Sequence, residues 1–466
     1  MKSFWKNVSR TARQNLGTYL GASCIIALGI FIYIAMMDTL HNLEDQIDIY
    51  YKNYFMADVF AQVPSIPLEE LEQLKDIPGV KEVYGRLGRD VRLLFDGQTE
   101  VVTLHLLAYD EGDVLNRLRV PKEKLEEDEI SLGSKMMDAY GYEEGDLITI
   151  LINGDAKTFS LAGSCYAPEY IYAIPPGGAM IPDGEIYDIA CMDKSEMEEL
   201  LGEQGMANEL GFSLSPGYTY EDVRYHLKER LEPFGLTSLC ERADQPSVTM
   251  VDGEINELIS MGSILPIIFM AISVFMLYIV LRKIIDRDRS LIGTMKAFGY
   301  KDSELILTYL RQGISIGVVG AVAGSVLAVP FGGFMFQIYA GFFNLPDTVY
   351  HSYVDTRING TAIALGTSMT AVYLGVRGIL KIAPAEAMRS AAPAANRTFR
   401  IPAWIGKRLN TMQKMGCRSI ARSPMRTFLI GLAIAFPFGM TAVLFSFTGV
   451  ANQMFYDQFS KVQTYD

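Results

Sequence analysis

Long runs of residues without charge constrain this chain more than any other feature of its sequence. No charged residue occurs between Arg13 and Asp38. Residues 17–37 are therefore long enough to cross a hydrocarbon core of about 30 Å as a helix. Four further uncharged runs are each long enough for one span. The sequence predicts a membrane α-helical bundle of about five transmembrane helices, at residues 17–37, 258–281, 312–340, 358–379 and 427–449.

Two other interpretations of these runs fit the sequence less well. The basic residues before the first run resemble the start of a cleaved signal peptide, but that run is longer than usual and lacks a small-x-small cleavage site at its end. Each run alone could also be a buried helix of a soluble protein. Five runs in phase with one charge pattern favour a membrane protein.

Charge is divided unevenly along the chain. Residues 38–257 hold 17 Lys+Arg and 45 Asp+Glu, a net −28, whereas the remainder holds 24 and 9, a net +15; together they give the formal −13 of the whole chain. The basic residues gather in segments 1–13, 282–311 and 377–426. Because basic loops stay on the inner side, these segments and the N-terminus are predicted to be cytoplasmic, in a multi-pass protein of the plasma membrane. The acidic total argues against a nucleic-acid partner.

The acidic segment 38–257 is predicted to be an extracytoplasmic α+β domain inserted between the first two spans. Its periodicity predicts helices at residues 67–75, 131–140 and 220–231. Two pairs of β-rich runs flank turn dipeptides, the first pair around Asp96-Gly97. The second pair, residues 147–152 and 157–162 around Asn153-Gly154, is the stronger hairpin signal.

Shorter segments connect these parts. Residues 1–16 are predicted to form an amphipathic cytoplasmic elbow helix, 341–357 an external loop, 380–426 a cytoplasmic linker and 450–466 the start of a second external segment. The aromatic residues of the external loop most simply form a belt at the membrane interface. They are Phe342, Phe343, Tyr350 and Tyr353.

The sequence offers no catalytic, cofactor or metal site. It has no G-x-x-x-x-G-K-[ST] loop for ATP, no H-E-x-x-H or C-x-x-C pair for a metal, and no G-x-S-x-G elbow. Cys165, Cys191 and Cys240 leave one external disulfide possible, and their state stays open. Apart from Arg377 near the inner end of residues 358–379, the spans carry no Asp, Glu, Lys or Arg, which argues against an ion-coupled transporter. Energy for any transport must then come from elsewhere.

Small residues recur along the third span. Such a stripe lets two helix backbones approach closely, either inside one chain or at a moving interface between permease halves. The sequence leaves both uses open. The residues are Gly313, Gly317, Gly320, Ala321, Gly324 and Ser325.

The cytoplasmic segment 282–311 contains an amphipathic stretch. Leu291, Ile292, Met295 and Phe298 recur as an apolar stripe, and Gly299 is placed to end the helix. Asp302 is placed to cap the next helix. On periodicity alone, this is a helix lying in the membrane interface between two spans.

Several stretches resemble one family. Residues 292–300, IGTMKAFGY, look like the I-G-x-L-K-A-x-G signature of FtsX-like, MacB-type ABC transporter permeases, and residues 382–389, IAPAEAMR, resemble its P-x-E-A-L-R segment. Residues 130–146 and 167–172 are similar to parts of the extracytoplasmic domain of that family. Many members have a glutamate before the isoleucine, whereas this chain has Leu291. If that glutamate normally contacts the ATPase, another residue of this chain would make the contact, for example Asp288 or Arg289.

The resemblance implies a non-catalytic permease subunit that transmits ATP-driven change to its external domain. A separate ABC ATPase subunit, carrying ATP and Mg²⁺, would bind the cytoplasmic helix, and the domain would export or extract a lipid, peptide or lipoprotein. A second permease half or copy, the lipid bilayer and an external partner or cargo are the other implied partners. The implied coupling residues are Arg287, Asp288, Arg289, Leu291, Ile292, Gly293, Met295, Lys296, Ala297, Phe298 and Gly299.

A segment near the end of the chain is similar in sequence to one near its beginning. Residues 421–429 share Ala, Arg, Thr and Leu with residues 12–20 at one constant offset, and both precede a predicted outward span. The chain is therefore interpreted as one four-helix unit and the opening of a second, as in duplicated members of the family. A five-span protein is the alternative.

Two other functions stay open. The chain could be a membrane scaffold that activates an external partner such as a cell-wall hydrolase. It could also be an enzyme with its site in the external domain, although no residues can be assigned to that site.

Overall fold

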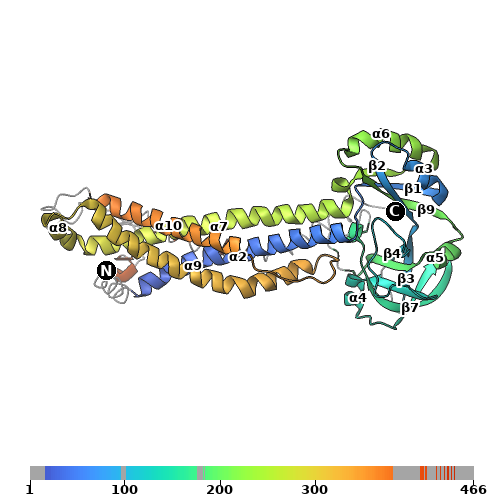
Figure 1. Cartoon of the computed structure of the whole chain (residues 1–466). Helices are drawn as coiled ribbons and strands as arrows, with labels where there is room; N and C mark the ends of the chain where they lie inside the picture. The colour runs from blue at the N-terminus through green and yellow to red at the C-terminus, as the bar shows by residue number, and fades with distance from the viewer. Residues whose placement is uncertain are drawn as a thin grey trace. The chain divides into compact units, whose positions relative to one another are not determined.

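The computed structural model describes residues 16–95, 101–175, 182 and 184–380, with scattered positions between 410 and 446 (Figure 1). The chain divides into two compact units, residues 1–273 with 312–370 and residues 274–311 with 371–466. The predicted elbow helix, cytoplasmic linker, fifth span, final segment and repeat, and the segment 382–389, lie wholly or largely outside the described residues.

Four long helices occupy the first four predicted spans. They are α2 (Leu16–Asn53), α7 (Pro246–Arg287), α9 (Asp302–Ala340) and α10 (Val354–Leu380). Within the described residues, three segments are long and apolar enough to cross a membrane, namely Tyr19–Asn53, Pro246–Ile279 and Asp302–Ala340. The helix α10 is not among them, so the count of five spans stays a prediction.

Two of these helices extend past the predicted edges of their spans. The helix α2 continues through Asp38 to Asn53, and α7 begins at Pro246, before the predicted start at residue 258. Both ends of the inserted segment are therefore helical. The β-rich part, residues 54–245, is called the head below.

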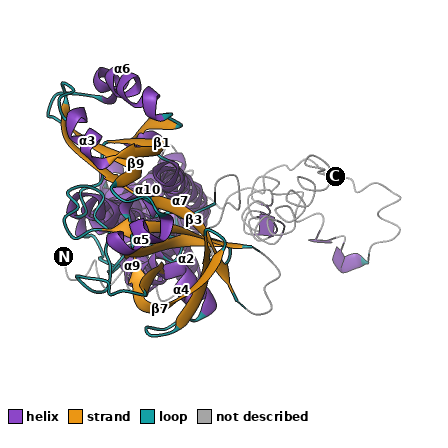
Figure 2. Ribbon diagram, turned by 90° about the vertical axis from the view of Figure 1, so that its right-hand side faces the viewer, coloured by secondary structure: helices purple, strands orange, loops and turns teal. Residues whose placement is uncertain are grey.

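The first part of the head is a four-stranded sheet with strand order β10-β1-β9-β2. Figure 2 shows β1 and β9 of this sheet with α3 (Leu68–Leu74) and α6 (Tyr220–Leu231) beside them. One face is covered by α3 and α6, whose Val223 and Leu227 are buried against it. Both helices were predicted, and α6 begins at a capping box made by Thr219 and Asp222. The strands are β1 (Val59–Pro67), β2 (Val80–Arg86), β9 (Met206–Leu214) and β10 (Ser238–Glu241).

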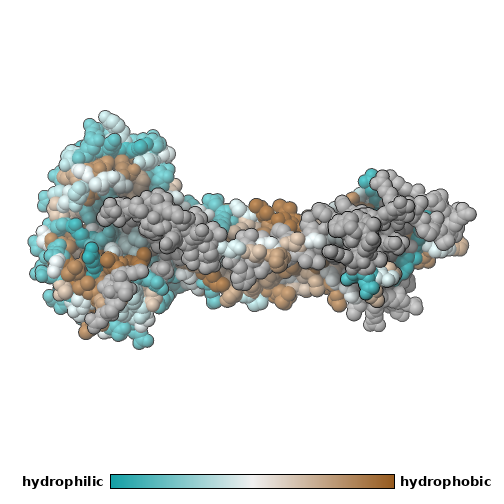
Figure 3. Space-filling view, turned by 180° about the vertical axis from the view of Figure 1, so that it is seen from behind, coloured by the Kyte–Doolittle hydropathy of each residue, from teal (hydrophilic) through white to brown (hydrophobic). Residues whose placement is uncertain are grey.

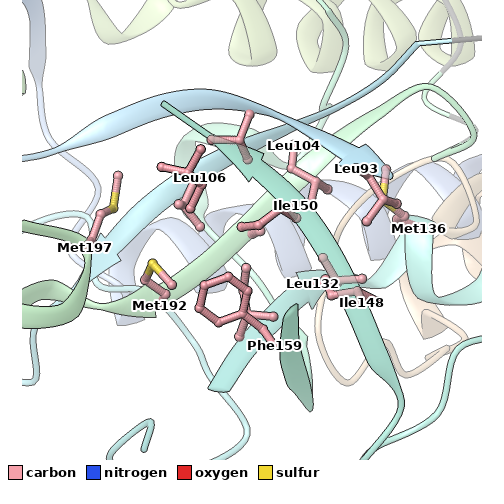
Figure 4. Packing of buried hydrophobic residues seen from close by; sticks show 14 of the residues in the cluster. Leu93, Leu104, Leu106, Leu132, Met136, Ile148, Ile150, Phe159, Met192 and Met197 are labelled. Carbon is pink, nitrogen blue, oxygen red and sulfur yellow. The ribbon is translucent and has the colours of Figure 1, made fainter. Parts of the chain in front are cut away.

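The second part is a closed barrel of strand order β3-β4-β8-β5-β7-β6. Its interior is packed with apolar side chains, including Leu104, Ile150 and Phe159, each fully buried (Figure 4). The strands are β3 (Gly88–Leu94), β4 (Val102–Tyr109), β5 (Glu129–Gly133), β6 (Leu147–Ile152), β7 (Asp155–Cys165) and β8 (Tyr187–Asp193), with helices α4 (Ser134–Tyr140) and α5 (Lys194–Leu201). The head is thus an α+β fold.

The barrel confirms one local prediction and corrects another. Strands β6 and β7 pair antiparallel, and Asn153 and Gly154 between them have φ of 52° and 95°, as a tight hairpin turn requires. The predicted helix 131–140 is wrong in its first part, because residues up to Gly133 form β5. There, Ile130 and Leu132 are buried, and β5 pairs with the distant β7 and β8.

The surface differs between the helices and the head. Apolar side chains gather on the visible face of the long helices, whereas the head is mostly hydrophilic (Figure 3). On α9 the exposed apolar residues include Val318, Val319, Val322, Val326 and Leu327. Such a surface is suited to lipid or to a neighbouring helix.

Candidate functional site

The helix α8 (Arg289–Ala297), in the second unit, contains most of the predicted coupling residues. It ends as predicted, at a left-handed Gly299 with φ of 88°. The amide of Tyr300 donates to the carbonyl of Met295 at 3.1 Å, and that of Gly299 to Lys296 at 3.0 Å. This pair of hydrogen bonds is the Schellman ending that glycine favours.

The apolar stripe of α8 is divided between two surfaces. Ile292 and Gly293 are buried and Met295 is partly buried. Leu291 and Phe298, seven residues apart, are 53% and 80% exposed. One part of the stripe therefore packs inside the unit, and the other part is presented to the surroundings.

Ion pairs hold the charged residues around α8. Lys296 Nζ lies 2.9 Å from Asp302 Oδ1, and Arg287 Nε lies 3.3 Å from Asp288 Oδ1. The predicted capping role of Asp302 is wrong, because Asp302 is already the first residue of α9. The amide of Lys301, the residue before the helix, instead donates to Glu304 Oε2 at 2.9 Å. Among the other predicted coupling residues, Arg289 is partly buried, and Ala297 and Gly299 are exposed.

The small residues of α9 pack inside the first unit. A Cβ on Gly324 would lie 2.6 Å from the carbonyl oxygen of Ala27, and one on Gly320 would lie 2.8 Å from Ile26, both on α2. A Cβ on Gly317 would lie 2.4 Å from Ser368 Oγ on α10. These three glycines therefore permit close packing of α9 against α2 and α10. Gly313 and Ala321 are also buried, and Ser325 is partly buried.

The loop between α9 and α10 is attached to the barrel at Asn344. The Asn344 amide donates to Ile171 O at 2.7 Å, and its Nδ2 donates to Asp188 Oδ1 at 3.1 Å. Ser134 Oγ donates to Asn344 Oδ1 at 3.0 Å. Asn344 and Asp188 are both buried. This end of the loop is therefore held by a polar network inside the head.

The other end of the same loop is attached to α2. Asp38, fully buried, accepts from Ser352 Oγ at 2.7 Å and from Tyr350 OH at 3.2 Å. Asn42 exchanges two hydrogen bonds with the backbone of His351, at 2.6 and 2.7 Å. The loop thus connects α2 to the barrel, and we call residues 341–353 the connecting loop.

The aromatic residues of the connecting loop do not form the predicted belt. Phe343 is buried and its ring lies 5.9 Å from that of Tyr172 in the head. Tyr350 and Tyr353 donate to Asp38 and Asp45 on α2. Phe342 is exposed. The prediction failed because these side chains have partners in elements distant in the sequence.

Sequence reasoning did not identify the connecting loop as a functional element. The available signal was polar residues beside apolar runs, namely Asp38 and Asn42 one helical turn apart and Asn344 between Phe343 and Leu345. Such residues in apolar surroundings require partners, because an unpaired buried polar group is costly.

Stability should depend on pH through Asp188. Burial raises its pKa to about 6, although the amides of Met136 and Ile189 oppose the shift. The folded protein therefore holds this proton more tightly than the unfolded chain does. The stability that Asp188 contributes is present below about pH 4 and is lost as the pH rises through about 6. In the wild type, this loss lowers the free energy of unfolding by about 3 kcal/mol. We expect Asp188→Asn to lack this pH-dependent change.

Thermal unfolding of the full chain in detergent at several pH values measures this effect. Asp138→Asn, at an exposed position on α4, is the matched control and should keep the wild-type pH profile. Parallel profiles for Asp188→Asn and the wild type would contradict the expectation.

Within residues 16–380, as far as the structure describes them, no three His, Cys, Asp or Glu side chains are placed to hold a metal ion. Cys165 and Cys191 are buried and Cys240 is partly buried, and all three are free thiols. The disulfide that the sequence left open is therefore not formed among these three cysteines.

Comparison with known proteins connects these elements to a family. The profile of the FtsX-like permease C-terminal family matches residues 263–384. The chain carries an FtsX-like permease domain. The match confirms the resemblance predicted from the sequence. The FtsX-like permease domain contains α8, the glycines of α9 and the connecting loop. Three helices in the described part of the chain are long and apolar enough to cross a membrane.

Two solved structures are similar to parts of the chain. One is the extracellular domain of the noncanonic ABC-type transporter YknZ from Gram-positive bacteria, with 13% identity, a TM-score of 0.25, and coverage of 38% of this chain and 91% of that one. The other is the periplasmic region of MacB from Actinobacillus actinomycetemcomitans, with 9% identity, a TM-score of 0.26, and coverage of 44% and 95%. No curated protein sequence matches the chain.

Proposed function

We propose that this chain is a non-catalytic permease subunit that binds a separate ABC ATPase through α8 and transmits ATP-driven change to the head. The observation that carries the proposal is the exposure of Leu291 on α8 and of Phe298 directly after it, within the FtsX-like permease domain. Exposed large apolar side chains rimmed by polar groups are typical of a protein-binding surface. ATP and Mg²⁺ would bind to the partner subunit.

The exposure of Leu291 also suggests what replaces the glutamate that many family members have at this position. Where many family members have an acid before the isoleucine, this chain has an exposed leucine. We infer that the contact with the ATPase is apolar at this position. Leu291 and Phe298 would fill a hydrophobic pocket of the ATPase, and Arg287 and Asp288 would lie at the polar rim.

The contacts of the first unit support transmission to the head. The helices α2 and α7 continue from apolar segments into polar ones that adjoin the head. The connecting loop binds α2 at Asp38 and the barrel at Asp188. A movement of α2 would therefore act on the barrel through the loop as well as through the chain itself.

The orientation and the cargo belong to the same proposal. The basic segments would be cytoplasmic and the acidic head extracytoplasmic, in a multi-pass protein of the plasma membrane. The head would export or extract a lipid, peptide or lipoprotein. A second permease half or copy would complete the transporter, and the exposed valines of α9 offer a face for it.

Copurification tests the proposed coupling. We expect the tagged full chain, extracted in mild detergent, to retain an ATP-hydrolysing subunit. Leu291→Glu with Phe298→Glu should lower the retained ATPase by about tenfold or more, because two charges would replace the apolar contact. These positions are more informative than Met295 and Lys296, which are partly buried.

The matched control is Tyr225→Glu, which places the same charge on an exposed aromatic residue of α6. It should retain the ATPase fully. Equal retention by the double variant and the control would refute α8 as the binding helix. Nucleotide-dependent activation of an external hydrolase without movement of cargo would instead support the scaffold function.

A further inference from the structure

A cavity of about 600 Å³, partly open to solvent, lies between the sheet and the barrel of the head. The register of the sheet explains its position. Phe60 of β1 pairs with Cys240 of β10 and with Gly211 of β9, which pairs with Tyr84 of β2. These side chains lie on the sheet face opposite α3 and α6, because alternate strand residues point to opposite faces. The open face of the sheet therefore forms one wall.

Charged residues from the sheet and the barrel meet at this cavity. Arg86 of β2 binds Glu169 through Nη2, and its Nε lies 3.1 Å from Glu209 Oε2 of β9. His105 of β4 lies 2.8 Å from Glu209 Oε1 and 2.7 Å from Asp90 Oδ1. All five residues line the cavity.

The ion pairs fix the charges of this wall. Burial alone would lower the pKa of His105, but Glu209 and Asp90 outweigh it and raise the pKa to about 9. Burial alone would raise the pKa of Glu209, but His105 and Arg86 lower it to about 2. Both groups are therefore charged at neutral pH, and their charges compensate each other.

Two polar atoms of this network have no partner. Arg86 Nη1 and Glu169 Oε2 are buried, and neither makes a hydrogen bond within the described part of the chain. The side chains are only 3% and 5% exposed. Leaving such groups unsatisfied is costly, and native proteins contain few of them without a reason. Arg86 Nη1 can only donate a hydrogen bond, and Glu169 Oε2 is a carboxyl oxygen that can accept one.

The remaining lining is largely apolar and aromatic. It includes Phe60, Tyr84, Tyr170, Tyr172, Tyr187 and Leu210. A cavity of this volume, with an apolar lining and a few convergent polar groups, has the character of a small-molecule site.

We propose that this cavity binds a peptide segment with apolar or aromatic side chains. A backbone amide supplies both groups that the cavity lacks, because its carbonyl accepts from Arg86 Nη1 and its N–H donates to Glu169 Oε2. The aromatic lining receives the flanking side chains. With two cations and three acids, the wall disfavours a ligand with a negative charge. This assignment names a cargo class and so deepens the proposed function, but the binding site does not depend on the ATPase.

Binding is tested with the full chain in lipid nanodiscs, without ATPase or nucleotide, by titration calorimetry. The first probe is acetyl-Phe-Tyr-amide, for which we expect saturable binding at one site. The second pair is N-benzyl-2-phenylacetamide and benzyl phenylacetate, an amide and an ester that differ in the group able to donate. The amide should bind about tenfold more tightly or better, because the ester cannot donate to Glu169.

Blocking variants locate the site. Cys240→Trp should abolish binding by filling the cavity. Gln62→Trp is a second block, from an exposed position on the same sheet face. Tyr225→Trp on α6 is the control for an added tryptophan. Thermal unfolding confirms that each variant is folded.

Three results would overturn the proposal: no saturable binding of the dipeptide, equal affinity for the amide and the ester, or unchanged binding to both folded blocking variants. Equal affinity for the amide and the ester would point to an acyl chain. Because no ATPase is present, failure of the coupling test at α8 leaves this experiment unaffected.

Discussion

Replacing Arg86 with methionine is expected to lower the free energy of unfolding of the head by about 3–5 kcal/mol. Arg86 is almost fully buried and pairs with the carboxylates of Glu169 and Glu209. Methionine keeps the apolar stem but leaves Glu169 without its cation. Removing one partner of a buried pair costs much more than the net value of the pair, because the remaining charge is neither solvated nor compensated.

Denaturant unfolding followed by circular dichroism measures this effect. Arg224→Met, which breaks the exposed pair of Arg224 with Glu221 at 3.6 Å, is the matched control and should change stability by less than about 1 kcal/mol. The double variant Arg86→Met with Glu169→Leu should recover part of the loss, since it removes the unpaired acid. A loss as small as that of the control would show that the buried network contributes little.

Replacing Gly324 with leucine is expected to cost about 3 kcal/mol or more and to separate α9 from α2. Its Cβ alone would lie 2.6 Å from the Ala27 carbonyl oxygen and 3.0 Å from Ile30 Cβ. The first of these is a backbone atom in a helix, so it cannot move without moving α2. Close approach of small residues is also the main attraction between membrane helices, because lipid is as apolar as a leucine side chain.

Thermal stability of the detergent-solubilised chain, followed by size-exclusion chromatography, measures the second effect. Gly366→Leu is the matched control, because a Cβ on Gly366 of α10 meets no atom within 4 Å. We expect the control to elute and unfold like the wild type, whereas Gly324→Leu aggregates at lower temperature. Equal behaviour of the two variants would mean that α2 and α9 do not pack at Gly324.

Local signals in the sequence predicted part of the fold. The hairpin around Asn153-Gly154 and the helix α6 with its capping box depend on residues close together in the chain, and the structure has both. Strands β1 and β10 were missed, because they pair over long separations, for example Val59 with Glu241. The helix predicted from residue 131 was in part a strand for the same reason, since β5 is held by β7 and β8.

The candidate site was predicted less completely than the fold. Periodicity placed Leu291 and Phe298 on one stripe with Ile292, but burial by other helices decides which of them stay exposed. The connecting loop was missed because Asn344 and Asp188 are 156 residues apart. The cavity was missed because its charges come from two β-structures that the sequence did not distinguish.

The uninterrupted length of α2 has a geometric consequence. With 38 residues and no proline, α2 extends over about 57 Å. A tilt of about 10° about Ala27 displaces the end at Asn53, 26 residues away, by about 7 Å. A shift of about 3 Å near Gly17 thus becomes more than twice as large near Asn53. Such amplification needs only a stiff helix and a fixed pivot. The close packing of Gly324 of α9 against Ala27 is placed to provide that pivot.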